Sequence, residues 1–264
     1  MVPCCLTIAG SDSGGGAGIQ ADLKAFSHLG CHGMSAVVAL TAQNTVNVME
    51  IMEVPPSFIE AQLKAIFSDI GVDVVKTGML FSPEIVVTVG SFLEKNPTPL
   101  VIDPVLIASS GAQLMQDAAA TVLIEHLFPL ATVVTPNLAE ACFLAGTPYD
   151  DDINRGELAE EIYNLGPASV VVTGGHGKEP IDWFYDGKEH MKIPLKRLST
   201  QATHGAGCTH SAAFAAFLAH GFSIKEAACR STEVAVSAVR NGFTDLGKGE
   251  GPVDVMNVAT RRPR

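Results

Sequence analysis

The chain has 264 residues, of which 47% are hydrophobic and 17% charged, and its formal net charge is −11. This apolar composition excludes a disordered chain, and no run of ~18 uninterrupted apolar residues predicts a membrane span. The excess of carboxylates, without a basic stripe, disfavours sequence-independent binding of nucleic acid. An anionic ligand would therefore need backbone N–H groups or a few well-placed cations.

Short apolar runs alternate with longer helical patterns along most of the chain. The runs that predict strands are 6–9, 35–41, 72–76, 100–102, 132–135 and 169–173. The patterns that predict helices between them are 19–29, 56–70, 83–94, 117–128, 138–145 and 157–165. This alternation favours a parallel sheet with helices on both faces, and the almost continuously apolar strands fit a sheet buried on both sides.

The last third of the chain has a different pattern. An Asp-Gly turn at 186–187 predicts an antiparallel hairpin of 183–185 against 190–193, at the edge of the sheet. Two predicted helices follow, at 209–219 and 224–239. Because we find no internal repeat, low-complexity tract or linker, we expect a single domain over residues 1–264.

The amino end and the cysteines bear on the compartment. The first cation is Lys24, so the amino end lacks the basic region of a secretory signal. The six cysteines contain no Cys-x-x-Cys pair, which disfavours a zinc ribbon and a redox motif. We therefore expect a cytoplasmic protein with mostly buried, free thiols.

The start of the helix predicted after residue 208 is one candidate site. Gly205 and Gly207 lead into a run of small apolar residues. Glycine lets backbone N–H groups turn toward a ligand, and a helix start carries about half a positive charge. Together they predict an anion hole. Cys208 falls in the first turn, where a thiol pKa of ~8.5 tends to fall. An ordinary turn before a buried helix is the alternative.

The loop after the first strand, residues 10–18, contains five glycines. It fits neither the P-loop pattern nor the dinucleotide-binding pattern, which disfavours a Walker-type NTPase and a dehydrogenase. We interpret it as a close backbone approach to a small ligand, with Asp12 and Asp22 as available carboxylates. A flexible turn is the alternative interpretation.

Asn137 and Glu140 lie three residues apart after Pro136. In the first turn of a helix this spacing puts both side chains on one face, where they can hold Mg²⁺ through water. The same spacing also predicts a capping box. The pattern alone favours the cap.

Taken in this order, the motifs resemble those of the hydroxymethylpyrimidine/phosphomethylpyrimidine kinases of thiamine biosynthesis, in the ribokinase-like superfamily. The matching segments are 10–24, 41–45, 76–80, 103–105, 135–140, 174–176, 203–209 and 247–253. The resemblance covers nearly the whole chain and implies a three-layer αβα fold around a mostly parallel sheet. It also implies transfer of the ATP γ-phosphoryl group to 4-amino-5-hydroxymethyl-2-methylpyrimidine, and a second transfer to the monophosphate.

The same resemblance implies roles for individual residues. Cys208 would be the general base, in a catalytic loop that also contains Gly205, Ala206 and Gly207. The N–H groups of Ala206 and Gly207 would surround the developing charge. Gln43 would hydrogen-bond the pyrimidine, in a pocket formed with Gly10, Ala17, Asp22, Met79 and Val105. Asn137 and Glu140 would organise Mg²⁺ through water, and the ATP would lie near Asn137, Thr173 and Gly175. A homodimer is implied as well.

Two residues depart from the pattern of the family. Thr173 stands where many relatives carry a lysine near the phosphates, and Lys76 and Lys178 are the candidates to replace that charge. His210 stands where an apolar residue is usual, and we expect it to face a neighbour or solvent.

Three other functions stay open on the sequence. A pyridoxal or pyridoxine kinase would act on a ring alcohol of similar size. A thiol hydrolase would pair Cys208 with His204 or His210, although both are close sequence neighbours of the cysteine, unlike a papain-like site. A non-catalytic sensor would bind a nucleotide or vitamin precursor without turnover, a possibility that Thr173 motivates.

Overall fold

The computed structural model describes residues 1–106, 117–175 and 179–261. Its strands form one sheet in the order β3-β2-β1-β4-β5-β6-β7-β8-β9. They are β1 (Cys4–Asp12), β2 (His32–Gln43), β3 (Val48–Glu53), β4 (Val74–Thr77), β5 (Leu100–Ile102), β6 (Val133–Val134), β7 (Val170–Val172), β8 (Ile181–Tyr185) and β9 (His190–Pro194). Neighbours from β2 to β7 pair in parallel, whereas β3, β8 and β9 pair antiparallel at the two edges.

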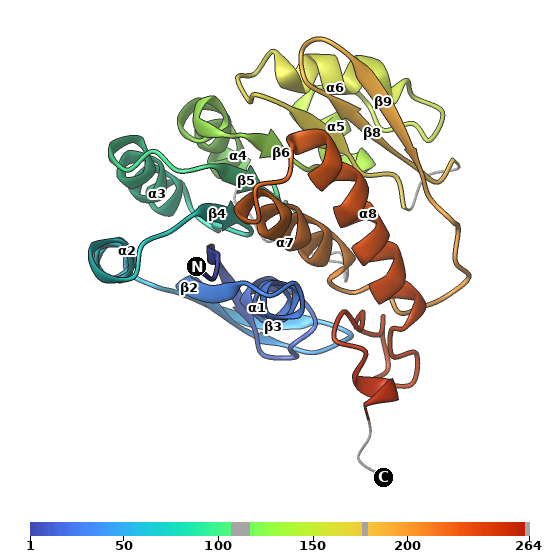
Figure 1. Cartoon of the computed structure of the whole chain (residues 1–264), viewed down its shortest axis with the longest axis horizontal. Helices are drawn as coiled ribbons and strands as arrows, with labels where there is room; N and C mark the ends of the chain where they lie inside the picture. The colour runs from blue at the N-terminus through green and yellow to red at the C-terminus, as the bar shows by residue number, and fades with distance from the viewer. Residues whose placement is uncertain (107–116, 176–178, 262–264) are drawn as a thin grey trace.

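Helices cover both faces of this sheet (Figure 1). One face packs against α1 (Gly18–His28), α7 (Ala206–Ala219) and α8 (Ile224–Arg240). The other face packs against α2 (Pro56–Asp69), α3 (Pro83–Lys95), α4 (Asp117–His126), α5 (Leu138–Leu144) and α6 (Arg155–Tyr163). Two short 3₁₀ helices, η1 (Phe128–Leu130) and η2 (Val258–Thr260), complete the elements. The predicted three-layer αβα fold with an antiparallel edge hairpin is confirmed.

The central helix α7 shows why these residues form this fold. It packs against α1 and α8 and against strands β1, β4 and β5. Its run from Ala212 to Ala216 is fully buried. A helix that is apolar all round needs such an enclosed position. The small alanines let α7 approach the sheet closely and so bring its first turn over the carboxyl ends of the strands.

Three elements differ from the prediction: one strand was not expected, and one strand and one helix are longer. No strand was expected at β3, because its side chains are exposed or half-buried and it is held by pairing with β2 rather than by burial. The strand β2 runs on to Gln43, past a register shift. The helix α7 begins at Ala206 rather than at residue 209, so Cys208 is the third residue of the helix instead of the residue before it.

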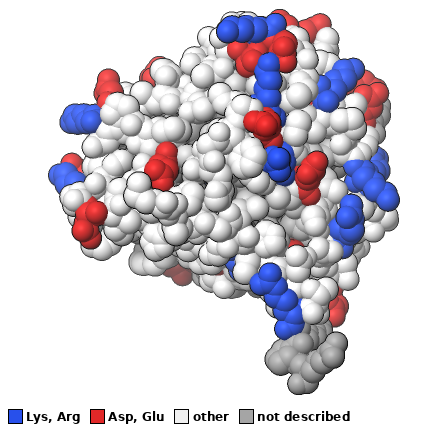
Figure 2. Space-filling model, viewed as in Figure 1, with Lys and Arg blue, Asp and Glu red and all other residues white. Residues whose placement is uncertain are grey.

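The surface carries its charges in a mixed arrangement. On the face shown in Figure 2, Lys and Arg side chains lie among Asp and Glu side chains rather than in one stripe. Within the described ranges, no helix combines the length and the apolar character that crossing a membrane requires.

Candidate active site

A cavity of about 510 Å³ opens beyond the carboxyl ends of the strands, where ligands bind in open α/β sheets. Every residue predicted for the site lines this cavity except Asp22. A wider hollow of about 910 Å³ lies between α2 and α3 and contains none of the predicted residues. The cavity at the strand ends is therefore the candidate active site.

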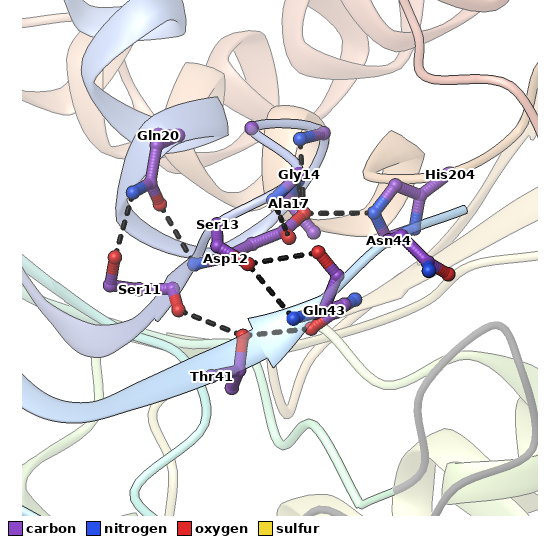
Figure 3. Close-up of polar contacts among 12 residues, drawn as sticks. Ser11, Asp12, Ser13, Gly14, Ala17, Gln20, Thr41, Gln43, Asn44 and His204 are labelled. Carbon is purple, nitrogen blue, oxygen red and sulfur yellow. Dashed lines mark hydrogen bonds and ion pairs between the residues drawn. The ribbon is translucent and has the colours of Figure 1, made fainter. Parts of the chain in front are cut away.

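The glycine-rich loop between β1 and α1 is held in one shape by Asp12 (Figure 3). Its carboxylate accepts hydrogen bonds from the N–H groups of Gly14, Gly16 and Ala17 at 2.7, 3.0 and 2.9 Å. His204 Nε2 lies 3.0 Å from the same carboxylate. Burial alone would raise the pKa of Asp12, but these hydrogen bonds hold it below its ordinary value. Asp12 therefore shapes the loop, contrary to the expectation of an available carboxylate.

The two glycine segments pack against each other. Gly205 caps α7 with a left-handed backbone, φ 82°, and a Cβ there would overlap the carbonyl oxygen of Gly16. A Cβ on Gly16 would in turn overlap the His204 ring. The Asp12–His204 contact thus holds the two loops together. The glycines are explained by this close packing rather than by a flexible turn.

The first turn of α7 provides N–H donors at the cavity. Thr209 N–H bonds to the Gly205 carbonyl at 2.9 Å and begins the helical ladder. Gly207 and Cys208 precede that residue, so their N–H groups point out of the helix end. The N–H of Ala206 bonds to the Thr203 carbonyl at 3.1 Å. The N–H groups available to an anion are therefore those of Gly207 and Cys208, one residue beyond the predicted pair of Ala206 and Gly207.

The pocket predicted for the substrate combines a polar end with an apolar wall. Gln43 ends β2, and its side-chain oxygen accepts a 3.2 Å hydrogen bond from Thr41. Met79 and Val105 belong to one small apolar cluster beside it. A Cβ on Gly10 would overlap the methyl group of Met79, so glycine leaves room for this wall. A flat ring with one hydrogen-bonding edge fits these surroundings.

A buried cation forms part of the cavity floor. Lys76 Nζ lies 3.0 Å from both Asp22 oxygens and 3.9 Å from Asp103, and Thr7 donates to Asp22 at 2.6 Å. Burial would lower the pKa of Lys76, but Asp22, Cys208 and Asp103 hold it well above its ordinary value. Asp22 itself is fully buried and does not line the cavity, so direct contact with a ligand was the wrong expectation.

The thiol of Cys208 differs from its expected state. Burial raises its pKa to about 12, an effect that Lys76 opposes without cancelling. The expectation of a lowered pKa is therefore wrong, because desolvation of the thiolate, with Asp103 and Asp22 nearby, outweighs the attraction of Lys76. With that pKa, Cys208 is a thiol at neutral pH.

Asn137 and Glu140 form the capping box that the pattern favoured. Glu140 accepts from the Asn137 N–H at 2.9 Å, and the Asn137 side chain accepts from the Glu140 N–H at 3.0 Å. Burial and the charge of Asp103 raise the pKa of Glu140 to about 8. Two buried carboxylates that raise each other's cost of ionisation fit a hydrated divalent cation. In the parts of the chain described, no three His, Cys, Asp or Glu side chains could hold a metal directly.

His210 belongs to a buried network in the wall of the cavity. Its Nε2 lies 3.1 Å from Ser231 Oγ and 3.8 Å from Asp182. Asp182 accepts from the Gly174 N–H at 2.8 Å and from Thr232 at 2.7 Å. This network ties α7 and α8 to the segment that carries Thr173 and Gly175. Burial lowers the pKa of His210, so it faces neighbours as a neutral ring.

Neither histidine proposed for a hydrolase forms a Cys–His pair by its Nε2 atom. His204 uses this atom for Asp12, and His210 uses it for Ser231. Nδ1 of His210 is buried without a hydrogen-bond partner, so among the described residues it does not bond to Cys208 either. These contacts disfavour a thiol hydrolase.

Many relatives carry a lysine at the position of Thr173. Lys76 does not replace that charge, because it is bound to Asp22. Lys178 lies outside the described residues. Exposed Lys196 and Arg197 line the outer part of the cavity and had not been expected there. Lys76 itself carried a usable signal, because a charged residue in a strand buried on both faces needs a buried partner.

Known proteins match this chain over most of its length. The family model described as phosphomethylpyrimidine kinase matches residues 12–254. A hydroxymethylpyrimidine/phosphomethylpyrimidine kinase of Rhizobium meliloti is 44% identical, over 96% of this chain and 97% of the relative. A thiamine biosynthesis bifunctional protein of Geobacter sulfurreducens is 46% identical, and the match spans 94% of this chain but only 51% of the relative.

Solved structures agree with this assignment. A phosphomethylpyrimidine kinase from Clostridium difficile has a TM-score of 0.79 and 41% identity, covering 90% of this chain and 99% of that one. An ADP complex of Bacillus subtilis pyridoxal kinase has a TM-score of 0.90 and 37% identity, covering 98% and 99%. The chain belongs to the phosphomethylpyrimidine kinase family.

Proposed function

We propose that this cavity transfers the γ-phosphoryl group of ATP to the hydroxymethyl group of 4-amino-5-hydroxymethyl-2-methylpyrimidine, and then to the monophosphate. The carrying observation is that the N–H donors of Gly207 and Cys208 face the same cavity as Gln43 and Met79. Phosphoryl transfer depends mainly on positioning and charge stabilisation. The ring pocket would position the substrate, and the start of α7 would stabilise the developing charge.

The ring would bind between Gln43 and the apolar wall of Met79 and Val105. Its hydroxymethyl group would then point toward Cys208 at the start of α7. The ATP would lie along the rest of the cavity, whose lining includes Pro180, Leu195, Leu198, Val236 and Val239 as apolar contacts for the base. Asn137, Thr173 and Gly175 would lie near the phosphates, and Lys196 and Arg197, which line the same cavity, would add positive charge.

Cys208 would accept the hydroxyl proton of the first substrate. With a pKa of about 12 it is rarely a thiolate at neutral pH, but each thiolate is then a strong base. Lys76, fixed below it, opposes the cost of forming that thiolate. A general base contributes ~10²–10⁴-fold, and only the first transfer has a hydroxyl proton to remove.

Mg²⁺ would be held through water by Asn137 and Glu140, beside Asp103. When bound, the ion supplies positive charge to the β- and γ-phosphates. Glu140 must lose its proton to take part, which its raised pKa opposes and a nearby cation favours. The capping box holds the Glu140 carboxylate in a fixed orientation at the start of α5.

A pyridoxal kinase is the second candidate function. Pyridoxal kinases of Staphylococcus aureus and B. subtilis have TM-scores of 0.89 and 0.90 to this chain, and one Staphylococcus structure is a complex with pyridoxal. Both candidate substrates are flat ring alcohols, so the geometry of the Gln43 pocket accommodates the chemistry of either.

The test is a substrate panel. The protein is incubated with ATP, Mg²⁺ and either the hydroxymethylpyrimidine, its monophosphate or pyridoxal, and products are followed by mass spectrometry. We expect mono- and diphosphate from the pyrimidine, with a higher kcat/KM than for pyridoxal. ATP binding by calorimetry without any product would instead support a non-catalytic sensor.

The single-domain organisation, the homodimer and the cytoplasmic location remain predictions. A dimer has a candidate surface on β2 and β3, where Leu40, Met49 and Met52 are 41%, 67% and 59% exposed. Exposed apolar side chains on an edge strand favour association.

A further inference from the structure

A loop near the carboxyl end of the chain bonds to two parts of the cavity lining without lining the cavity itself. Residues 243–253, which we call the strap, follow α8, and none of these described residues lines the cavity. The Phe243 N–H donates to the Pro252 carbonyl at 3.0 Å and closes the base of the strap. In Figure 1 this red segment reaches the hairpin of β2 and β3. Compact loops with closed ends are frequently functional.

Thr45 connects the strap to the hairpin that carries Gln43. Its hydroxyl oxygen accepts hydrogen bonds from the N–H groups of Lys248 and Gly249 at 3.1 and 3.2 Å. A Cβ on Gly249 would overlap the Thr45 carbonyl oxygen, and a Cβ on Gly247 would overlap the Thr45 side chain. Glycine therefore permits this close approach. Thr45 itself is half-buried and does not line the cavity.

The strap also bonds to the segment that leads into α7. The Thr203 hydroxyl donates to the Glu250 carboxylate at 3.0 Å. The His204 N–H donates to the Gly251 carbonyl, and the His204 carbonyl accepts from the Val253 N–H, both at 3.1 Å. Because Thr203 and His204 line the cavity, these bonds fix the segment directly before the helix start.

The main chain of Gln43 is fixed separately by the glycine-rich loop. The Ser13 hydroxyl donates to the Gln43 carbonyl and accepts from the Gln43 N–H, both at 2.8 Å (Figure 3). The turn 44–47 follows, with Thr45 inside it. The end of the hairpin is thus held by two loops, by the glycine-rich loop at Gln43 and by the strap at Thr45.

We propose that Thr45 is a positioning residue for the phosphoryl transfer, an inference that rests on the proposed function. Through the strap, Thr45 fixes Gln43, which would hold the ring, relative to the start of α7, where the transfer would occur. Transfer requires the reacting atoms to lie about 3–3.5 Å apart, so the two parts of the cavity must be held in register. Since Thr45 does not line the cavity, it acts on the reaction by placing other residues.

The test is the substitution Thr45→Val, which keeps the size of the side chain and removes the acceptor of two hydrogen bonds. A looser hairpin lowers the fraction of molecules with a formed ring pocket, and the apparent affinity for the ring falls by that fraction. We expect the KM for the hydroxymethylpyrimidine to rise about three- to tenfold, with the KM for ATP unchanged. Thr45→Ser keeps the oxygen and should retain the KM of the parent chain.

Two further variants show whether the strap contact is the cause. Gly249→Ala places a Cβ against the Thr45 carbonyl and should raise the same KM, so it decides alone if Thr45→Val does not fold. The double variant should resemble the more affected single variant, because both changes open one contact. Thr88→Val is the matched control. It removes a hydroxyl that bonds to the Glu84 carbonyl in α3 at 2.7 Å and should change neither KM.

Hydrogen exchange provides a readout that does not depend on turnover. In Thr45→Val, the amides of 43–47 and 203–208 should exchange faster than in the parent chain, whereas those of α3 should not. A parent chain that forms no product from any ring alcohol contradicts the proposed function, and the exchange pattern then decides whether Thr45 couples the two loops. An unchanged KM in the folded variants of an active parent, an equal rise in Thr45→Ser, or unchanged exchange would overturn the proposal.

Discussion

At the scale of single residues, the site depends on a few charges enclosed beneath the cavity. Lys76 and Asp22 are fully buried and form an ion pair, and Asp103 lies beside them. Removing one partner of a buried pair leaves an uncompensated charge, whereas an exposed pair contributes little. A substitution at one of these residues should therefore affect the stability of the fold as well as the proposed site.

The substitution Lys76→Met should lower the free energy of unfolding by about 3–5 kcal/mol, because Asp22 and Asp103 would lose their cation. The matched control is Lys64→Met, which removes an exposed partner of Glu60 on α2 and should cost about 0–1 kcal/mol. Urea unfolding of both variants measures the difference. Similar losses in the two variants would show that Lys76 is not an essential counter-ion.

The thiol of Cys208 gives a pH prediction. Its pKa of about 12 means that the thiolate fraction rises about tenfold per pH unit between pH 7 and pH 9. The kcat/KM of the first transfer should rise through the whole range, while that of the second, which starts from a phosphate oxygen, should rise only as Glu140 ionises with its pKa of about 8 and then level off. Parallel pH profiles of the two transfers measure this. A plateau of the first transfer in this range would exclude Cys208 as its base.

At the scale of elements, the predictable parts of the chain were those whose sequence pattern reports burial. The strand β5 and most helices follow from apolar periodicity within a few residues. The strand β3 does not, because pairing with β2 holds it and its side chains are largely exposed. The network of Asp182 and His210 was also missed, since it joins residues that are far apart in sequence. A raised thiol pKa likewise depends on tertiary burial, which local sequence does not report.

The capping box at α5 permits its two roles to be separated. Glu140→Gln keeps a capping side chain and resembles the protonated carboxyl that a pKa of about 8 implies at pH 7. We expect unchanged thermal stability but lower turnover at every Mg²⁺ concentration. Asn137→Ala should instead lose about 1 kcal/mol of stability. Calorimetry and turnover assays distinguish these outcomes, and full activity of Glu140→Gln would leave the residue as a cap alone.

At the scale of the whole molecule, a net charge of −11 must be compatible with the proposed binding of phosphates. In the proposed site, N–H groups at the start of α7, the enclosed Lys76, and Lys196 and Arg197 in the cavity lining would supply the positive charge locally. Motif order predicted the family and the position of the cavity correctly. The position of each counter-ion could be assigned only from the folded structure, because the charged partners are far apart in sequence.

The expected homodimer is testable on the same scale. The double substitution Met49→Lys, Met52→Lys places charge on the exposed side of β3 and should convert a dimer to monomers. Phe143→Lys is the control, since this side chain is 55% exposed on α5, away from β3. Light scattering after size exclusion gives the mass. A monomeric parent chain, or dissociation by the control, would contradict the predicted surface.

The most direct test of the proposed mechanism is single-turnover transfer in Cys208→Ala. The first phosphorylation should fall by about 10²–10⁴-fold, because its hydroxyl proton loses an acceptor. The second should fall far less, because its acceptor is a phosphate oxygen. Quench-flow with mass spectrometry follows both products from one enzyme. Equal losses in the two steps would contradict the assignment of Cys208 as the base of the first transfer.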